Sequence, residues 1–220
     1  MDRRSELSRI QLRVIASGVC RSLLVWSLAA TGAGCGARYH ATAPSGQFAF
    51  AQKIAVPGIA DFGKVNDFLY RGGQPGRDAV EQLKKFDIDT VIDLRGELHG
   101  LIENERQQAE SLGMRFINLP GNGWAAPKDE EIARFFALVR EQPRRKIFLH
   151  CWLGGDRSGM FIAAYRIAFD GWTPEQAIQE MRAFHYLEFW HPNMKNYIRH
   201  FPARLASSPE LAAFRQMTAN

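Results

Sequence analysis

The segment HCWLGGDRSG at residues 150–159 constrains this chain more than any other part of its sequence. The apolar run at 146–149 before it predicts a buried strand, and the apolar run at 159–169 after it predicts a helix. A glycine-containing loop between a strand and a helix directs backbone N–H groups toward an anion, and the helix dipole adds positive potential. We therefore expect an anion-binding loop at residues 152–157.

The side chains in and beside this loop predict nucleophilic chemistry. Positive potential there would stabilise a thiolate at Cys151, and a thiolate is a nucleophile. Arg157 can bind two phosphate oxygens at once, and Ser158 can donate to the sulfur as it leaves an intermediate. His150 is expected to orient the cysteine rather than to act as a base. The other residues expected to contact substrate are Trp152, Leu153, Gly154 and Gly155, the glycines because they let the backbone come close to a ligand.

Strand and helix patterns alternate along the rest of the chain. Strands are predicted at 68–70, 90–94 and 114–119, and helices at 78–86, 103–112, 127–139, 173–181 and 194–204. This alternation predicts an α/β fold with a central, mostly parallel twisted sheet flanked by helices.

The N-terminal residues have the pattern of a targeting signal. Arginines come first, an apolar run follows at 23–30, and small residues lead to Cys35. The uncharged stretch at 22–34 has 13 residues, whereas a membrane-spanning helix needs about 20. The ending GAGC resembles a bacterial lipoprotein cleavage box, which implies a lipid on Cys35. An ordinary signal peptide or an uncleaved anchor is the alternative.

The charge distribution argues against a nucleic-acid partner. The net charge is +5, but residues 1–35 hold five arginines against Asp2 and Glu6, which leaves the remainder near neutrality. We expect an exported lipoprotein, anchored to a membrane and facing the periplasm or the exterior. A secreted or periplasmic soluble protein is the alternative. After lipoprotein processing Cys20 would be removed and Cys35 acylated, so Cys151 would be left without a disulfide partner.

The segment from His150 to Ser158 resembles the signature of the cysteine-dependent protein tyrosine phosphatase superfamily. LYRGGQP at 69–75, TVIDLR at 90–95 and GMRFINLP at 113–120 resemble its dual-specificity branch in order and spacing. The resemblance implies a dual-specificity phosphatase-like fold and hydrolysis of phosphotyrosine or phosphoserine/threonine through a phosphocysteine intermediate. It implies no cofactor and no metal.

The resemblance also divides the chain. The expected parts are a signal at 1–35, a linker at 36–57, a phosphatase domain at 58–205 and a C-terminal helix or tail at 206–220.

The general acid departs from the family pattern. Most members of the superfamily supply an aspartate from a separate loop before the cysteine, but the corresponding window INLPGNGWAAPK contains no acidic residue. Asp156 resembles the acid of myotubularin lipid phosphatases and of some secreted bacterial phosphatases, and it is our expected acid. Its other interpretation is a carboxylate that holds Arg157 or caps the helix. Asp129 is the alternative acid, although a helix N-terminal position suits it better.

The sequence leaves both the substrate and the functional class of the protein open. The Asp-Arg ending makes phosphoinositides or inositol phosphates an alternative to phosphorylated proteins. A non-catalytic phosphate-binding pseudophosphatase and a rhodanese-like sulfurtransferase are weaker alternatives.

Several further residues have two interpretations each. Arg95 is expected to be an exposed arginine at a strand end, with contact to a second phosphate as the alternative. Trp124 and Trp152 fit either the mouth of a pocket or the core. Solvated or core positions are expected for His185, His191 and His200.

Overall fold

The computed structural model describes residues 49–141 and 145–218. The predicted signal, Cys35 with its predicted lipid, and most of the predicted linker lie outside the described residues. Within the described ranges, no helix combines the length and the apolar character needed to cross a membrane.

Six strands form one sheet in the order β1-β2-β3-β6-β4-β5. They are β1 (Gln52–Lys53), β2 (Gly63–Lys64), β3 (Leu69–Gly72), β4 (Ile88–Asp93), β5 (Arg115–Asn118) and β6 (Lys146–His150). The neighbours β3, β6, β4 and β5 run parallel, and β2 and β1 extend the β3 edge in antiparallel fashion. The predicted α/β fold with a mostly parallel central sheet is confirmed.

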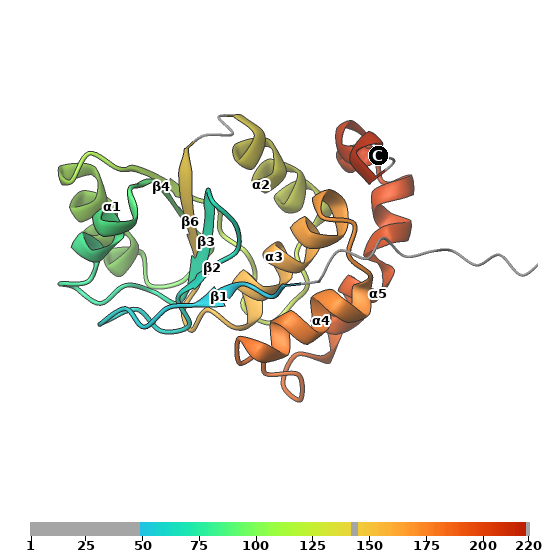
Figure 1. The fold of residues 1–220 in the computed structure, drawn as a ribbon, viewed down its shortest axis with the longest axis horizontal. Helices are drawn as coiled ribbons and strands as arrows, with labels where there is room; N and C mark the ends of the chain where they lie inside the picture. The colour runs from blue at the N-terminus through green and yellow to red at the C-terminus, as the bar shows by residue number, and fades with distance from the viewer. Residues whose placement is uncertain (1–48, 142–144, 219–220) are drawn as a thin grey trace, which may run out of the picture. The chain divides into compact units, whose positions relative to one another are not determined.

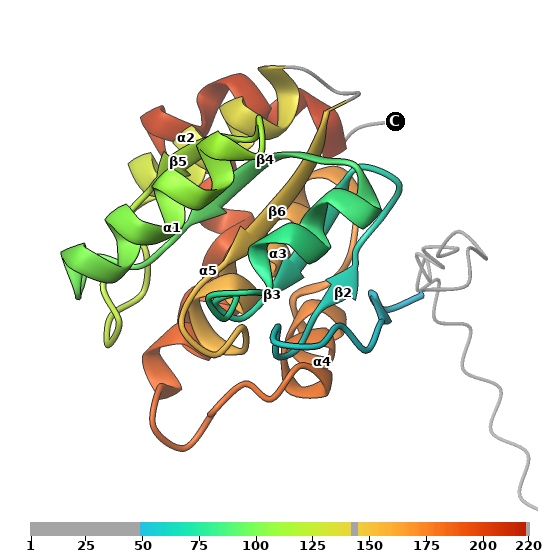
Figure 2. The same cartoon turned by 90° about the vertical axis from the view of Figure 1, so that its left-hand side faces the viewer.

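Helices cover both faces of the sheet (Figures 1 and 2). They are η1 (Val80–Phe86), α1 (His99–Ser111), α2 (Asp129–Glu141), α3 (Asp156–Phe169), α4 (Pro174–Ala183), α5 (Pro192–Ser207) and η2 (Pro209–Thr218). In Figure 1, α1 lies on one side of the sheet, while α2, α3, α4 and α5 lie on the other.

Successive strand residues serve two different cores, because side chains alternate between the faces of a strand. Ile92 and Leu149 belong to the larger core, which α2, α3, α4 and α5 complete. Their chain neighbours Val91 and Phe148 belong to the smaller core, with η1 and α1. Burial on both faces explains why the central strands read as continuous apolar runs rather than as alternating patterns.

The central helix α3 is surrounded by other elements. All of its residues from Arg157 to Ala168 are buried, which explains an apolar run that has no polar face. The helix begins at Asp156, earlier than the predicted 159. The last residues of the anion-binding loop therefore already belong to its first turn.

The domain begins earlier in the chain than the predicted residue 58. Ala51 is buried, and its N–H donates to a Glu180 carboxylate oxygen at 2.6 Å. Strand β1 follows at once, so the domain includes the end of the predicted linker at 36–57. A two-residue strand leaves no periodicity that a sequence pattern can reveal. At the other edge, η2 places Leu211 and Phe214 in the larger core, so the predicted C-terminal helix or tail is part of the domain.

Candidate active site

The parallel strands bring the predicted loop to the carboxyl edge of the sheet. Strand register pairs Gly72 of β3 and Asp93 of β4 with His150 of β6, so these strands end level with one another. Open parallel sheets bind ligands at this edge. Cys151 follows β6 directly, and α3 begins five residues later at Asp156.

Cys151 lies where negative charge on sulfur is stabilised. Its thiol is free, and the residue is 3% exposed. The Gly154 N–H donates to its Sγ at 3.3 Å, and the carbonyl of the same glycine accepts from Arg71 Nη2 at 2.7 Å. The hydrogen bond to sulfur and the nearby N-terminus of α3 both direct positive potential at the sulfur.

Arg71 is a buried cation beneath the loop, and sequence reasoning did not identify its role. Its side chain is fully buried, and its guanidinium lies 4.2 Å from the centre of the Phe184 ring. Burial lowers the pKa of Arg71 to about 10, which still leaves the side chain charged at neutral pH. It therefore places a second positive charge under the loop. The sequence signal that could have pointed to Arg71 is the segment LYRGGQP, which contains it.

The two loop glycines are required by backbone that packs against the loop. Gly154 has a φ of +90°, and a Cβ there would lie 2.6 Å from the carbonyl carbon of Gly72. A Cβ on Gly155 would lie 2.6 Å from the His185 carbonyl oxygen. Glycine thus lets the loop pack closely on β3 and on the segment after α4. The predicted reason, close approach to a ligand, omitted these backbone contacts.

Ser158 makes a different hydrogen bond from the predicted one. Its side chain is fully buried, and its hydroxyl donates to the Gly72 carbonyl at 3.2 Å, which ties α3 to the end of β3. The expected donation from Ser158 to the sulfur as it leaves phosphocysteine stays a prediction; in this structure the Gly154 N–H bonds the sulfur.

Arg157 is held so that one edge of its guanidinium stays free. Glu97 accepts from Nη1 at 3.0 Å and from Nη2 at 2.6 Å, and the Leu94 carbonyl accepts from Nη1 at 3.1 Å. A guanidinium has five N–H donors, so these contacts leave the Nε–H and one Nη2 hydrogen. The two lie along one edge, which suits two oxygens of a phosphate group.

Glu97 is a site residue that sequence reasoning missed. It follows β4 and lies 60 positions from Arg157 in the sequence. Its hydrogen bonds from Arg157 lower the pKa of Glu97 to about 2, so the carboxylate stays ionised at any ordinary pH. Glu97 is therefore a positioning residue for Arg157.

The variant Glu97→Gln is expected to lower kcat/KM for phosphate release by about 10-fold, because a neutral amide holds Arg157 less firmly in its productive orientation. Steady-state kinetics on an aryl phosphate measures this loss. Glu103→Gln is the matched control, since Glu103 is an exposed residue that pairs with Arg106 at the surface. Equal kcat/KM in the two variants would contradict the positioning role.

The same ion pair has a pH signature. Because the pKa of Glu97 is lowered, the ion pair stabilises the fold fully above the ordinary carboxyl pKa of about 4.3. This contribution is lost as the pH falls through the lowered pKa of about 2. The stability difference between the wild type and Glu97→Gln is therefore expected to shrink over that interval. Thermal midpoints measured across it would show the change.

Asp156 lines the same pocket as Cys151 and Arg157. Its Oδ1 accepts the Leu187 N–H at 2.9 Å, and its Oδ2 lies 3.9 Å from Nε2 of His191. The structure thus brings the expected acid into the pocket. His191 is 7% exposed, which agrees with the core alternative of its prediction, and it also lines this pocket, which the sequence did not indicate.

Asp129 lies elsewhere. At the start of α2, it accepts hydrogen bonds from the Tyr197 hydroxyl at 3.0 Å and from Arg204 at 3.2 Å. It is absent from the residues that line the pocket of Cys151. The helix N-terminal position expected for Asp129 is therefore found, and the alternative acid is not brought to the cysteine.

A buried charge cluster lies behind the loop. His150 Nε2 lies 2.9 Å from a Glu105 carboxylate oxygen, and its Nδ1 lies 3.3 Å from the Cys151 carbonyl. Burial alone would lower the pKa of His150, but the carboxylates of Glu105 and Asp93 outweigh it and raise this pKa. The contacts with Glu105 and with the Cys151 carbonyl hold the His150 ring in one place directly behind the nucleophile.

Arg95 completes this cluster, which corrects both of its predicted roles. The residue is fully buried and bonds Asp93 at 2.9 and 2.8 Å and Glu105 at 2.5 Å. Potential ligand atoms of Asp93, Glu105 and His150 lie within 4.8 Å of one another, but the Arg95 guanidinium already compensates their negative charge. The cluster therefore supports the loop from within the fold.

The pocket has a volume of about 410 Å³. It is lined by Glu97, Gly123, Trp124, Cys151, Trp152, Leu153, Asp156, Arg157, Leu187 and His191. Trp124 and Trp152 are 74% and 42% exposed, which places them at the mouth of the pocket rather than in the core.

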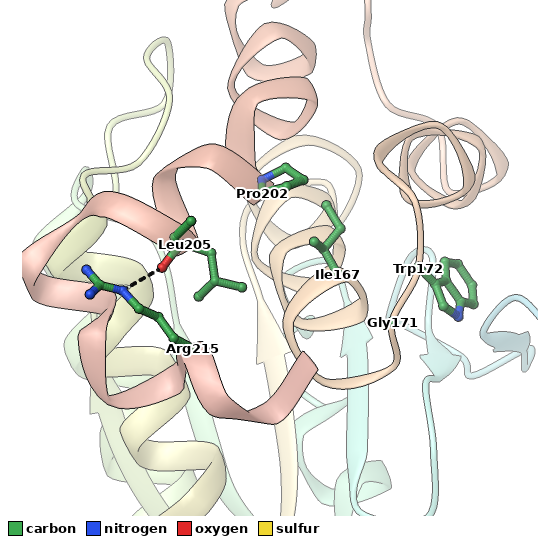
Figure 3. Close-up of a pocket in the computed structure, with 7 residues that line it drawn as sticks. Ile167, Gly171, Trp172, Pro202, Leu205 and Arg215 are labelled. Atoms are coloured by element: carbon green, nitrogen blue, oxygen red, sulfur yellow. Dashed lines mark hydrogen bonds between the residues drawn. The ribbon is translucent and has the colours of Figure 1, made fainter. Parts of the chain in front are cut away.

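A second cavity, of about 470 Å³, has different walls (Figure 3). It is lined by Ile167, Gly171, Trp172, Pro202, Leu205, Ala206 and Arg215. Arg215 Nε donates to the Leu205 carbonyl at 3.1 Å. Its walls contain neither a carboxylate nor a thiol, so the chemistry of the site belongs to the pocket of Cys151.

Known proteins are similar to this chain in sequence. The family model described as DSP-PTPase phosphatase fused to NAD+ kinase matches residues 60–191. The dual specificity protein phosphatase TpbA of Pseudomonas aeruginosa is 25% identical over 147 residues, which cover 67% of this chain and 65% of that protein. The chain therefore spans just under two thirds of the length of this curated relative.

Solved structures share the fold. The crystal structure of a TpbA variant from P. aeruginosa in complex with pTyr superposes with a TM-score of 0.60 and 21% identity, over 78% of this chain and 96% of that one. The core catalytic domain of the PP-IP phosphatase SIW14 from S. cerevisiae has a TM-score of 0.57 and 17% identity, over 72% and 98% of the two chains.

Proposed function

Since the chain belongs to the family described as DSP-PTPase phosphatase fused to NAD+ kinase, we propose that it is a cysteine-dependent phosphatase. It hydrolyses phosphomonoesters through a phosphocysteine intermediate. The observation that carries this proposal is the placement of Cys151 and the free edge of Arg157 in one pocket at the start of α3.

In the first step, the Cys151 thiolate attacks phosphorus. The S–P bond forms as the bond between phosphorus and the leaving oxygen breaks. The free N–H groups of Arg157, the loop amides and the α3 dipole stabilise the charge on the other phosphate oxygens. Asp156 protonates the leaving oxygen, so that an alcohol or phenol departs.

In the second step, water hydrolyses phosphocysteine. Asp156, now ionised, takes a proton from the attacking water, the S–P bond breaks, and inorganic phosphate and the Cys151 thiolate are regenerated. The buried cation Arg71, beneath the loop, favours the return of negative charge to the sulfur. Neither step consumes a cofactor.

The variant Asp156→Asn is expected to lose about 100-fold or more in kcat on a phosphotyrosine peptide, because a phenol with a pKa of about 10 leaves poorly without a proton donor. On dinitrophenyl phosphate, whose leaving group is far more acidic, the loss in the first step should be much smaller. The measurement is the ratio of single-turnover rates on the two substrates. Asp129→Asn is the matched control.

A ratio unchanged by Asp156→Asn would show that Asp156 only holds the loop, through its contact with Leu187. A shift of the ratio in Asp129→Asn would move the acid to α2.

Two substrate classes share this chemistry. Phosphorylated tyrosine, serine or threonine side chains are one class, which the dual-specificity relatives and the pTyr complex of TpbA support. Phosphoinositides or inositol phosphates are the other class. We also propose that the chain is exported and held at a membrane, because residues 1–35 carry the order of features typical of a signal that ends at a lipid-bearing cysteine.

A further inference from the structure

The mouth of the active-site pocket is surrounded by large exposed apolar side chains. Four of them line the pocket, and two more follow Leu187 in the same loop. We name this set the apolar collar: Trp124, Trp152, Leu153, Leu187, Phe189 and Trp190. Figure 2 shows that the segment between α4 and α5, which carries the last three, projects from the helices as an extended loop.

The apolar collar concentrates the exposed apolar surface of the domain in one place. Among the residues whose burial the structure describes, 49–141 and 145–215, nine large hydrophobic side chains are exposed, and six of them belong to the collar. Phe189 is 86% exposed and Trp190 is 65% exposed, and their rings pack edge to face at 5.4 Å. Large apolar side chains gathered around one pocket mouth are typical of a binding surface.

Two carboxylates beside the apolar collar, Glu97 and Glu188, have internal ion-pair partners. Glu188, between Leu187 and Phe189, pairs with both Arg182 and Lys195. Glu97 pairs with Arg157. Unpaired charges would oppose entry into a low-dielectric layer, and these pairs remove much of that opposition. The apolar side chains of the collar can therefore enter an apolar layer without also burying these charges unpaired.

The residue types of the apolar collar are those that insert into the interfacial layer of a membrane. Tryptophan, phenylalanine and leucine supply the apolar contact area in that layer. A collar inserted there would bring the pocket, with Cys151 at its base, to the level of the lipid headgroups. Residues 36–48, which precede the described domain, span up to about 45 Å when extended, so a lipid on Cys35 would leave the domain free to reach the surface.

We infer that the apolar collar docks the domain on a membrane surface, and that the substrate is the phosphomonoester headgroup of a membrane lipid. The inference rests on the proposed function, because it names a substrate class for the same site. A phosphopeptide with apolar flanking residues would use the same surface in a different way, and the experiment separates the two.

The test uses the full chain and the double variant Phe189→Ser/Trp190→Ser, neither residue of which lines the pocket. The control is Phe50→Ser, an equally simple change at an exposed phenylalanine beside Trp172, outside the collar. Four substrates are compared: phosphatidylinositol 4-phosphate in phosphatidylcholine vesicles, its water-soluble deacylated headgroup, an apolar phosphotyrosine peptide, and p-nitrophenyl phosphate.

The double variant is expected to lose about 10-fold or more in kcat/KM on vesicles, because insertion concentrates the enzyme at its substrate. Its rates on the deacylated headgroup and p-nitrophenyl phosphate should stay within about 2-fold of wild type. Phe50→Ser should keep its rate on vesicles.

Equal rates of wild type and double variant on vesicles would overturn the inference. So would a selective loss on the phosphotyrosine peptide, which would assign the apolar collar to a peptide. Absence of turnover on p-nitrophenyl phosphate by the wild type would instead contradict the proposed function, and this separates the two failures.

Discussion

Replacing Cys151 by serine is expected to reduce phosphate release by about 10,000-fold or more, because removal of a catalytic nucleophile typically has an effect of this order. The serine hydroxyl is not ionised at neutral pH, so the stabilisation that the loop offers to a thiolate acts on no nucleophile. The measurement is phosphate release from p-nitrophenyl phosphate and from a phosphotyrosine peptide.

The serine variant should keep the fold and the phosphate site. The residue is 3% exposed, serine is slightly smaller than cysteine, and the Gly154 N–H that bonds the sulfur can bond an oxygen. Binding of inorganic phosphate, followed by calorimetry, should therefore persist. Turnover within about 10-fold of wild type would place the nucleophile elsewhere.

The variant Arg157→Lys is expected to reduce kcat by about 100- to 1,000-fold, the range seen when a charge-stabilising donor is removed from an active site. A lysine ammonium is a point charge, so it cannot bond Glu97 and Leu94 and also present two donors along one edge. Because lysine keeps the positive charge, the kcat of this variant tests the contribution of the two-donor edge separately from that of the charge.

The control for this variant is Arg115→Lys. Arg115 pairs with Glu141 at 2.7 Å, and both side chains are about half exposed, so the same substitution there should leave kcat unchanged. A kcat for Arg157→Lys within about 5-fold of wild type would show that charge alone suffices, and that the edge left free by Glu97 has no catalytic role.

The parts of the site that sequence predicted correctly are local. Strand, loop and helix follow one another between 146 and 169, so periodicity and two glycines were sufficient to place Cys151 and Arg157. The sequence predicted a mostly parallel sheet but not the order of its strands. The crossovers that put β6 between β3 and β4 produce no pattern within any single segment.

The parts that were missed depend on contacts between distant segments. Glu97 reaches Arg157 only because β4 and β6 are parallel neighbours that end level with each other. Glu105 reaches His150 from α1 for the same reason. The hydroxyl of Ser158 donates to the Gly72 carbonyl because α3 lies beside the end of β3, a contact between segments 86 positions apart that no local pattern predicts.

The general acid shows how structure narrows a choice that sequence left open. Both aspartates stand at helix N-termini, Asp129 in α2 and Asp156 in α3. Sequence offered no distance from either one to the cysteine. The pocket includes Asp156 and leaves Asp129 with Tyr197 and Arg204.

The central claim is a covalent intermediate on Cys151, and its most direct test is to trap it. Asp156→Asn on dinitrophenyl phosphate should form phosphocysteine readily and hydrolyse it slowly, because only the second step then requires the missing carboxylate. Mass spectrometry of protein denatured during turnover is predicted to find one phosphoryl group on the peptide that contains Cys151. Phosphate release with an unmodified Cys151, or with the phosphoryl group on another residue, would contradict the account.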